Sequence, residues 1–364
     1  MKKVLQVITV PLGHDGVSMF VRRYVSAMDK RDLQVDFLAI NDVDDTVARE
    51  IAQMGCGLHI IKGRLKNPVK YALKLAGLVR REKYGVVHVH GNSCTMAVDL
   101  MGAYLGGARV RAAHSHNTGC RFMAAHRLLR PAFDHLYTHA FACGEEAGRW
   151  LFGKKPFEII RIAVDAEKYA FDPGLRAEYR REMGVGDDML IGSVAHFSPH
   201  KNHAFLIDAF AEYHKINPSA RLALVGDGQL RGEVENAIAS RGLEKHVMLL
   251  GLRHDVNRLL SAFDVMLLPS LFEGFPTVLV EWQCAGLRAF VSDTVTRSAD
   301  ITGLVSYLPI SDGPAPWAEA IMRMESRFDR AAASADGIEK VRARGYDLSE
   351  NAEKLRQWYY ENCK

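Results

Sequence analysis

Two glutamates eight positions apart stand in a short segment that could bind a phosphorylated sugar. Glu273 and Glu281 belong to PSLFEGFPTVLVEWQCAG (269–286), which follows the apolar run Val265–Leu268. That run predicts a buried strand, and Pro276 suits the first position of a helix, so Glu273 falls in a loop and Glu281 in the helix. Free N–H groups at a helix start bind anions, and carboxylates accept hydrogen bonds from sugar hydroxyls. The segment therefore predicts a site for a sugar attached to a diphosphate.

A lysine and two glycines follow other predicted strands. Lys201 lies in GSVAHFSPHKNH (192–203), between a strand and a helix, where its point charge can meet a phosphate. Gly226 and Gly228 close the next strand, and glycine lets a backbone approach a ligand closely. Taken alone, the lysine could be a solvated loop residue and the glycines a tight turn. Beside the two glutamates, we interpret Lys201 as part of the site.

The N-terminal segment MKKVLQVITVPLG predicts a first strand rather than a signal peptide, because Gln6, Thr9 and Pro11 interrupt its apolar run. The loop Gly13–Val17 joins this strand to the first predicted helix. Its backbone amides could cradle a phosphate. The loop matches neither the GxGxxG motif nor the P-loop motif.

Four histidines form two pairs, His88 with His90 and His114 with His116, and each pair ends a predicted strand. Residues i and i+2 of a strand share a face, so His114 and His116 could ligate one metal ion. The chain has no HExxH motif or companion cysteine pattern to support a metal. We interpret the pairs as polar strand ends that line a ligand site, where one histidine of each pair could be structural.

Strands and helices alternate through both halves of the chain, which predicts parallel sheets with helices on both faces. The expected strands are Val4–Val10, Gln34–Ile40, His59–Ile61, Val86–His90, Arg109–Ser115, Ala140–Cys143, Leu190–Ala195, Ala220–Val225, Val247–Leu250, Val265–Leu268 and Ala289–Val291. The expected helices are Val17–Met28, Val47–Met54, Val69–Glu82, Cys94–Leu105, Glu145–Phe152, Ala204–Lys215, Leu230–Arg241, Asp255–Ala262, Thr277–Ala285 and Pro316–Phe328.

With 364 residues the chain is long for one core, so we expect two Rossmann-like α/β domains that face each other across a cleft. Ligands of such folds bind at the carboxyl ends of the strands. The boundary is expected near Ile160–Phe171, with Asp172-Pro173-Gly174 as a turn just past it.

Bulk properties exclude several classes of protein. The net charge of +4 gives no footprint for a nucleic-acid binder. The six cysteines are scattered without a CxxC pair, which fits a reducing cytoplasm better than a zinc site or a disulfide framework. No run approaches the roughly 20 apolar residues of a membrane helix.

Basic residues gather between Lys62 and Lys83, and Lys66, Lys70 and Lys74 fall at helical spacing. Such a stripe can attract anionic lipid headgroups at about 1 kcal/mol per residue. Solvated helix faces are the commoner explanation of charged stripes, so both interpretations stay open here. The complete set in this region is Lys62, Arg64, Lys66, Lys70, Lys74, Arg80, Arg81 and Lys83, followed later by Arg121, Arg127 and Arg130.

Several segments, in their order along the chain, resemble a known family of enzymes. They are AAHSHNT (112–118), ACGEEAGRWLFGKK (142–155), VAHFSPHKNHAFLIDAF (194–210), ALVGDGQLRGEVE (223–235), VMLLGLRHDVNRLLSAFDVMLLPSLFEGFPTVLVEWQCAGL (247–287) and VSDTVT (291–296). The sequence resembles retaining glycosyltransferases of family 4, which have the GT-B fold, and among them the bacterial capsular and exopolysaccharide type. Glu273 and Glu281 occupy the family's Glu-x7-Glu pattern.

The resemblance implies a role for each site residue. Glu281 would hydrogen-bond the ribose hydroxyls of a nucleotide donor, and Glu273 would hold hydroxyls of the donor sugar. Lys201 would neutralise the diphosphate as it leaves. The other contacts to the donor would come from Gly16, from His116 or its close alternative His114, from Gly226 and Gly228, from the loop Leu252–His254, and from Phe275, Pro276 and Thr277. Residues 1–165 would be the acceptor-side domain, residues 166–345 the donor domain, and residues 346–364, near Asn351–Tyr360, a helix that packs back on the first domain.

Two positions depart from the family pattern. Ala195-His196 stand where the family has Gly-Arg, so His196 is the expected contact to the donor diphosphate. His196 can supply the arginine's charge only when protonated, and it cannot form a bidentate fork. Ile162-Ala163-Val164-Asp165 keeps only the aspartate of the family's Asn-Gly-hydrophobic-Asp motif.

The implied reaction moves a hexose-type sugar from a nucleotide-sugar, a UDP-sugar by resemblance, to a hydroxyl of a saccharide or lipid-linked saccharide, with retention. The leaving diphosphate would help to deprotonate the acceptor, so Glu273 would orient the donor rather than attack it. No cofactor and no metal are expected, because Lys201 and helix N-termini would replace the cation, and the acidic loop Asp42–Asp45 is interpreted as solvated. The alternatives are a GT-B nucleotide-sugar 2-epimerase and a nucleotide-sugar-binding protein without catalysis. We expect a cytoplasmic protein that docks on the inner membrane face through residues 62–83.

Overall fold

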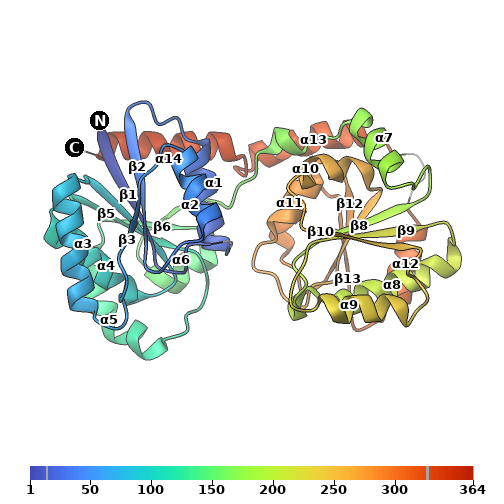
Figure 1. Ribbon diagram of the computed structural model, residues 1–364, viewed down its shortest axis with the longest axis horizontal. Coiled ribbons are helices and arrows are strands. Elements are labelled where there is room, and N and C mark those ends of the chain that lie inside the picture. Colours follow the sequence, from blue (N-terminus) through green and yellow to red (C-terminus); the bar gives the residue numbers. More distant parts are fainter. Residues whose placement is uncertain (14, 325–327, 364) are drawn as a thin grey trace. The chain divides into compact units, whose positions relative to one another are not determined.

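The structure is a computed structural model that describes residues 1–13, 15–324 and 328–363. It comprises two compact units, which Figure 1 shows with colours that follow the chain. Unit 1 contains Met1–Ala163 together with Leu348–Lys364, and unit 2 contains Val164–Asp347. The chain thus leaves unit 1 within the expected boundary region Ile160–Phe171.

Unit 1 is built on a seven-stranded parallel sheet in the order β3-β2-β1-β4-β5-β6-β7. Its strands are β1 (Lys2–Ile8), β2 (Leu33–Ala39), β3 (Leu58–Ile60), β4 (Val86–Gly91), β5 (Val110–Ser115), β6 (His139–Ala142) and β7 (Glu158–Ile159). Its helices are α1 (Gly16–Ala27), α2 (Asp45–Gln53), α3 (Pro68–Glu82), the 3₁₀ helix η1 (Cys94–Met96), α4 (Ala97–Gly106), α5 (Met123–Leu136), α6 (Glu145–Phe152) and α14 (Leu348–Asn362).

The C-terminal helix α14 completes the core of unit 1. Leu348, Ala352, Leu355 and Tyr359 recur at the spacing of one helix face, which predicts a buried stripe. All four are buried in the cluster that also holds side chains of α1, β1 and β2. The end of the chain therefore adds buried side chains, Tyr359 among them, to the inside of unit 1.

Unit 2 repeats the design with a six-stranded parallel sheet in the order β10-β9-β8-β11-β12-β13. Its strands are β8 (Leu190–Val194), β9 (Arg221–Val225), β10 (Val247–Gly251), β11 (Val265–Leu268), β12 (Arg288–Ser292) and β13 (Val305–Leu308). Its helices are η2 (Ala166–Tyr169), α7 (Pro173–Glu182), η3 (Pro199–Lys201), α8 (His203–Ile216), α9 (Arg231–Ala239), α10 (Val256–Leu259), η4 (Leu260–Ala262), α11 (Thr277–Cys284), η5 (Arg297–Ala299), α12 (Ala315–Met322) and α13 (Arg330–Ala343).

Each sheet reverses its strand order once, between β1 and β4 in unit 1 and between β8 and β11 in unit 2. Loops that leave the carboxyl ends of two strands at such a point diverge, and the crevice between them is where these folds bind ligands. Gly16 follows β1, Lys201 follows β8 and Glu273 follows β11. The topology therefore carries three predicted site residues to the switch points of their own units.

Every expected strand is present, with bounds that differ by at most two residues. The structure adds the short strands β7 and β13, each at the edge of its sheet, and the helices α5, α7 and α13. The helix expected over Pro316–Phe328 corresponds to α12, which ends at Met322, and residues 325–327 lie outside the described part of the chain. Among the described residues, no helix is long and apolar enough to span a membrane.

Two local predictions about prolines were wrong. Asp172-Pro173-Gly174 is the start of α7 and not a turn, because the Asp172 carboxylate accepts hydrogen bonds from the amides of Gly174 and Leu175 at 2.6 and 2.9 Å. Aspartate followed by proline is as typical of an N-cap and first helical residue as of a turn. Pro276 is the N-cap of α11 rather than its first residue, with φ −74° and ψ 99°, and the helix begins at Thr277.

Candidate active site

In unit 2, the loops that follow β8 and β11 bring Lys201 and Glu273 together. Lys201 ends η3, and its Nζ lies 2.5 Å from Oε1 of Glu273. Ser270 Oγ donates a hydrogen bond to the same oxygen at 2.7 Å. The Lys201 and Glu273 side chains are only 16% and 11% exposed. A carboxylate and an ammonium thus neutralise each other in a largely desolvated place, while the contact of Lys201 with a phosphate stays a prediction.

Backbone contacts fix these two loops against each other. The Leu271 amide donates to the carbonyl oxygen of His200 at 2.7 Å. The carbonyl oxygen of Ser270 accepts hydrogen bonds from the hydroxyls of Ser292 and of Thr294, the latter at 2.8 Å. Sequence reasoning missed Ser270 and its two hydroxyl partners. The available signal was that Ser270 comes two residues after strand β11 and that Ser292 and Thr294 stand in the quoted segment VSDTVT.

Helix α11 presents its N-terminus beside Glu273. Among the described residues, no side chain caps the amides of its first turn, which begins at Thr277. The Phe275 ring stacks on Tyr346 at 5.2 Å between centroids with 6° between the planes, which anchors the loop before the helix. Glu281 lies in the second turn and is 5% exposed. The loop and helix positions expected for the two glutamates are therefore as the pattern predicted, apart from the role of Pro276.

The glycine turn after β9 packs against the loop that carries His196. A Cβ atom at Gly226, whose φ is +139°, would lie 2.0 Å from the carbonyl oxygen of Ala195. One at Gly228 would lie 2.4 Å from that of Phe197 and 2.8 Å from Cε1 of His196. Close packing of two protein loops thus accounts for both glycines, while their contact with a nucleotide stays a prediction. His196 itself is exposed.

In unit 1, the loop after β1 leads into α1, and His14 lies outside the described residues. No described atom lies within 4 Å of a Cβ built on Gly16, so space is open there. The first turn of α1 is already capped: Asp15 Oδ1 accepts from the amides of Val17 and Ser18 at 3.0 and 3.2 Å. A carboxylate at this helix start competes with a phosphate for the same amides. The phosphate contact expected at Gly16 therefore meets an electrostatic obstacle that the sequence interpretation did not include.

The two histidine pairs of unit 1 meet in one cluster. His88, His90 and His114 are at most 2% exposed, whereas His116 is partly exposed. Burial lowers the pKa of His88 and of His116 to about 3 and holds the pKa values of His90 and His114 well below the ordinary value. All four rings are therefore neutral near pH 7. Of the two histidines proposed to contact a donor, only His116 reaches the surface.

Three of these rings are close enough to suggest a metal site, but they are poorly aligned for one. Ring nitrogens of His88, His90 and His114 lie within 4.8 Å of one another. The His88 ring stacks on His90 at 4.2 Å with 29° between planes, and on His114 at 5.3 Å with 14°. An imidazole lone pair lies in the plane of its ring, so nearly parallel rings do not direct their lone pairs at one tetrahedral ion. The arrangement suits stacking and hydrogen bonding better than coordination.

Comparison with known proteins identifies the family. Residues 176–304 match the family described as "Glycosyl transferases group 1". Over 337 residues the chain is 34% identical to EpsF of Bacillus subtilis (strain 168), which is named as a glycosyltransferase, and the match covers 88% of this chain and 87% of EpsF. The chain belongs to the group 1 glycosyl transferases. This glycosyltransferase is also 28% identical, over 63% of either chain, to the UDP-Gal:alpha-D-GlcNAc-diphosphoundecaprenol alpha-1,3-galactosyltransferase of Escherichia coli.

Solved structures confirm the fold. HepE of Anabaena, crystallised in complex with UDP, superposes with a TM-score of 0.79 at 18% identity, covering 99% of this glycosyltransferase and 100% of HepE. WaaG, a glycosyltransferase involved in lipopolysaccharide biosynthesis, superposes with a TM-score of 0.65 at 16% identity, covering 97% of this chain and 99% of that one. The resemblance stated from the sequence is thereby confirmed at the level of the group 1 glycosyl transferases and for the GT-B fold of two Rossmann-like domains.

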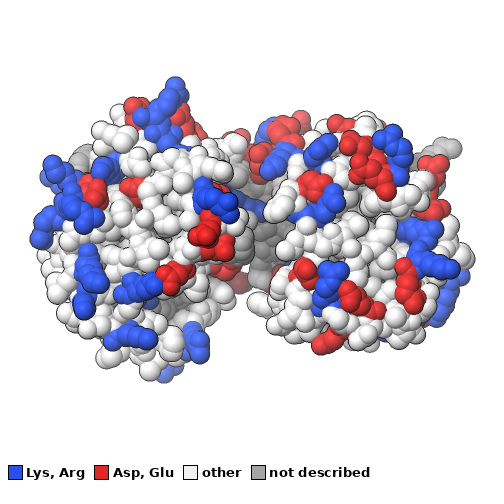
Figure 2. All heavy atoms as spheres, viewed as in Figure 1, with Lys and Arg blue, Asp and Glu red and all other residues white. Residues whose placement is uncertain are grey.

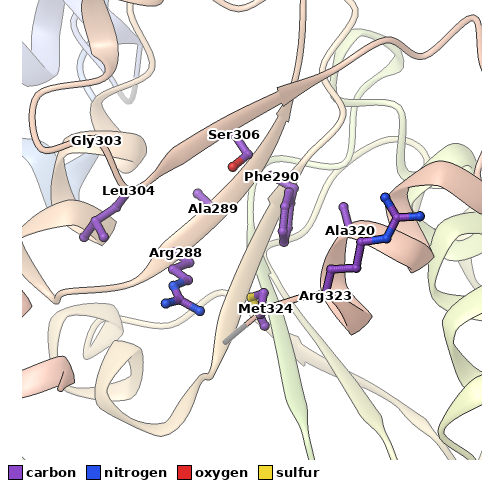
Figure 3. A pocket seen from close by; sticks show the side chains of 9 residues that line it. All are labelled: Arg288, Ala289, Phe290, Gly303, Leu304, Ser306, Ala320, Arg323 and Met324. Atoms are coloured by element: carbon purple, nitrogen blue, oxygen red, sulfur yellow. The ribbon is translucent and has the colours of Figure 1, made fainter. Parts of the chain in front are cut away.

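A cavity of about 280 Å³ in unit 2 of the glycosyltransferase lies away from the predicted residues. Figure 3 shows Arg288 of β12 and Arg323 after α12 at this cavity. Arg323 pairs with Glu319 at 2.9 Å, and Arg288 lies over the ring of Phe328. The cavity contains none of the predicted site residues, so we assign it no part in the reaction. Its complete lining is Arg288, Ala289, Phe290, Gly303, Leu304, Ser306, Ala320, Arg323 and Met324.

Proposed function

We propose that this glycosyltransferase moves a hexose-type sugar from a UDP-sugar to a hydroxyl of a saccharide or lipid-linked saccharide in cell-surface polysaccharide synthesis, with retention. The observation that carries the proposal is the Lys201–Glu273 pair at the switch point of unit 2, beside the uncapped start of α11. A cation and free amides suit a diphosphate, and a carboxylate beside them suits sugar hydroxyls. The named relatives, a galactosyltransferase that uses UDP-Gal and a UDP-bound structural neighbour, support UDP as the nucleotide.

Different residues of unit 2 would bind the ribose, the diphosphate and the sugar of the donor. Glu281, one turn into α11, would accept hydrogen bonds from the ribose hydroxyls. The backbone amides of Phe275 and of Thr277, the first residue of α11, would face the diphosphate. Glu273 would exchange its bond to Lys201 for a hydroxyl of the donor sugar. Lys201, released from that bond, would turn to the diphosphate, so that each charged group keeps a partner throughout.

The chemical step needs charge stabilisation more than a nucleophile from the protein. The bond between the anomeric carbon and the diphosphate oxygen breaks, and the electron pair leaves with the diphosphate. The acceptor oxygen attacks the same face of the sugar, and its proton passes to the departing diphosphate. Lys201 and the amides of α11 stabilise the charge that develops, which is the role of a preorganised electrostatic site. On this proposal the reaction requires no metal ion.

Unit 1 would contribute His116 and the backbone at Gly16. His116 is the accessible member of the histidine cluster, and we propose that it contacts a donor sugar hydroxyl. Because Asp15 already holds the first amides of α1, Gly16 would offer only close backbone approach rather than a full anion site.

The direct test combines ligand binding with turnover. UDP and UDP-sugars should raise the apparent melting temperature more than GDP or GDP-sugars, because a ligand of the native state stabilises it. Mass spectrometry should then detect a new glycoside when the stabilising UDP-sugar is incubated with a lipid-linked saccharide. Interconversion of UDP-sugars without acceptor would indicate an epimerase, and tight binding without turnover would indicate a binding protein; either result would contradict the proposal.

We also propose that unit 1 docks on an anionic membrane surface. Lys70 and Lys74 are exposed on α3 and Lys66 is exposed just before it, and on the same helix the side chains of Val69 and Leu73 are 69% and 60% exposed. Lysine and arginine side chains gather over the α3 region of unit 1 in Figure 2. Contiguous exposed apolar groups mark interaction sites, and lysines beside them favour anionic lipid. Further exposed apolar side chains on the neighbouring helices α4 and α5, and on the residue just before α5, are Met101, Tyr104, Leu105, Phe122, Met123 and Leu128.

One member of the predicted basic set is not on this surface. Arg64 is 5% exposed and forms a buried ion pair with Asp99, in which Nη2 lies 2.5 Å from Oδ2. It also donates to the carbonyl oxygen of Thr95, and Tyr71 donates to Asp99 at 2.8 Å. The arginine therefore ties the loop before α3 to α4, and the prediction that it belongs to a basic surface was wrong.

Sedimentation with lipid vesicles tests the docking surface. The Lys70→Glu, Lys74→Glu double variant should bind phosphatidylglycerol vesicles at least about tenfold more weakly, given about 1 kcal/mol per lysine. The matched control, Lys154→Glu with Lys245→Glu, changes the net charge equally at two other exposed positions. Equal loss in both double variants, or equal binding to neutral phosphatidylcholine vesicles, would contradict a specific anionic docking face.

A further inference from the structure

A chain of side-chain hydrogen bonds crosses the inside of unit 1 from the C-terminal helix to His116. Gln6 on β1 donates from Nε2 to the Tyr359 hydroxyl at 3.0 Å. Its Oε1 lies 2.8 Å from Nε2 of His90. Nδ1 of His90 in turn lies 3.0 Å from Nε2 of His116. Gln6, His90 and Tyr359 are at most 2% exposed, so water does not compete for these bonds.

The chain has a direction, which the amide of Gln6 sets. An amide oxygen can only accept, so His90 must carry its proton on Nε2. A neutral imidazole has one N–H, which leaves Nδ1 of His90 as an acceptor. His116 must then donate from Nε2, and its own Nδ1 is left without a proton. The deduction requires that Oε1 of Gln6 faces His90, as in this structure, and that both rings are neutral, which their lowered pKa values favour.

Tyr359 is the partner of the Gln6 amide nitrogen. Its hydroxyl oxygen accepts the N–H of Gln6 and also lies 2.6 Å from Nδ1 of His88. The His116 ring is further held by its neighbours: it stacks on His114 at 4.1 Å between centroids and meets the edge of Phe20 at 4.9 Å. Both the rotation and the tautomer of His116 are thus determined by side chains that lie deeper in unit 1.

We propose that Gln6 and Tyr359 are positioning residues that hold His116 with an unprotonated Nδ1, ready to accept a hydrogen bond from a hydroxyl group of the donor sugar. The assignment of the sugar rests on the function proposed above, whereas the tautomer does not. It explains why helix α14, which returns to unit 1 after unit 2, places a tyrosine hydroxyl among the histidines. Outside this relay, His88 Nε2 and both nitrogens of His114 have no hydrogen-bond partner among the described residues.

Nitrogen-15 NMR of the ligand-free full chain, labelled at histidine, reads the tautomer directly. The His116 signals are assigned by their loss in His116→Gln. We expect a protonated Nε2 and an unprotonated Nδ1 in the native protein. Gln6→Met, which keeps the side-chain length, and Tyr359→Phe should each give a mixture of tautomers. Tyr360→Phe, which removes a hydroxyl from the exposed neighbour on the same helix, should leave the native pattern.

Each result decides the proposal. A native His116 with its proton on Nδ1 overturns it, and so does an unchanged pattern in a folded Tyr359→Phe variant. If Gln6→Met does not fold, the native tautomer and Tyr359→Phe still decide. In turnover assays, both variants should lower kcat by about fivefold to tenfold, the loss of roughly one hydrogen bond, with a smaller change in nucleotide affinity. If the tautomer is as proposed but His116→Ala leaves turnover unchanged, the relay stands and the sugar contact proposed above fails.

Discussion

The two units hold their predicted site residues by different physical means. In unit 2, the central pair consists of full charges, with Lys201 and Glu273 at 2.5 Å; Lys201 ends the short 3₁₀ helix η3 and Glu273 stands on a loop. In unit 1, the corresponding residues are neutral rings, and the partners of His90 and His88 are the uncharged side chains of Gln6 and Tyr359. The site residues of unit 2 are thus held by an ion pair, and those of unit 1 by hydrogen bonds between neutral side chains.

This difference separates two tasks of a sugar transfer. The ion pair of Lys201 and Glu273 can exchange partners when an anion and a sugar arrive, because attraction between charges acts over several ångströms. A neutral hydrogen bond acts only at contact and in one direction, so it suits the orientation of a single group. Experiments that change charge should therefore act mainly on unit 2, and experiments that force charge onto unit 1 should damage its fold.

The largest expected effect is a loss of folding stability on acidification, because the histidines of the cluster take up protons when the protein unfolds. The pKa of His88 is about 3 in the native protein and near 6.5 in an unfolded chain. Above about pH 6.5 neither state binds the proton and full stability is present. As the pH falls from about 6.5 to about 3, only the unfolded chain takes it up, so stability is lost by up to about 1.4 kcal/mol per pH unit for this histidine.

Urea unfolding of the full chain between about pH 7.5 and 5 measures this slope. His88→Phe should reduce it, since the substituted chain has one fewer histidine to protonate on unfolding. His135→Gln, a change at an exposed histidine of the same unit, should leave it as in the native protein. Equal slopes for the native protein and His88→Phe would show that the cluster is not held neutral, and the contrast between the units would fail.

The next largest effect is expected from breaking the charge pair of unit 2. Lys201→Ala and Glu273→Ala should each lower kcat by about 10²–10³-fold, the usual loss when one stabilising group of a charged transition state is removed. Nucleotide affinity should change less for Glu273, whose proposed partner is the sugar. Because the two act as a unit, the double variant should lose about as much as either single one.

Steady-state kinetics and UDP titration of the three variants test this prediction. The matched control is Lys215→Ala, which breaks an exposed ion pair with Glu212 in the same unit. Full additivity of the two losses would mean that Lys201 and Glu273 act independently, and a loss confined to KM would remove the transition-state role.

Much of this contrast follows from the sequence, and the rest depends on tertiary contacts. The run Val265–Leu268 and the glutamate spacing predict the loop of Glu273 and the helix of Glu281, since both signals are local. An aspartate before a predicted helix is also a local signal of an N-cap. The competition of Asp15 with a phosphate at Gly16 is apparent only from the hydrogen bonds that its carboxylate accepts in the structure. Position 359 lies on a polar C-terminal stretch, and its contact with Gln6, at the opposite end of the chain, has no local signature.

The basic region shows the same limit. The spacing of Lys66, Lys70 and Lys74 predicts a stripe, and these side chains are exposed. Arg64 precedes them in sequence and has the same charge, yet it is buried because Asp99 lies on the neighbouring helix α4. Sequence spacing along one helix cannot show a partner on another, so the charge count of a segment overstates its surface charge.

A smaller effect is expected at Glu281, whose proposed partner is the ribose. Glu281→Ala should weaken UDP binding by about 10–100-fold, which corresponds to the loss of hydrogen bonds to a charged group worth about 1.5–3 kcal/mol. The comparison of UDP with 2′,3′-dideoxy-UDP sharpens the test. If Glu281 binds the ribose hydroxyls, the variant and the native protein should bind the dideoxy nucleotide equally, as measured by titration calorimetry. If the variant instead binds both nucleotides more weakly by the same factor, Glu281 does not contact the ribose hydroxyls.

The smallest effect concerns a histidine that differs from those of unit 1 by its exposure. His196 stands where the family has arginine, and it is exposed beside Gly228. An imidazole cannot form the bidentate fork that a guanidinium offers to a phosphate, so His196→Arg should bind the donor a few-fold more tightly if this position meets the diphosphate. His135→Arg introduces an arginine at an exposed position of unit 1 and should leave donor affinity unchanged. Titration calorimetry with the stabilising UDP-sugar measures both variants. Unchanged donor affinity in His196→Arg would mean that this position does not reach the diphosphate, and that Lys201 carries the electrostatic role in unit 2 without it.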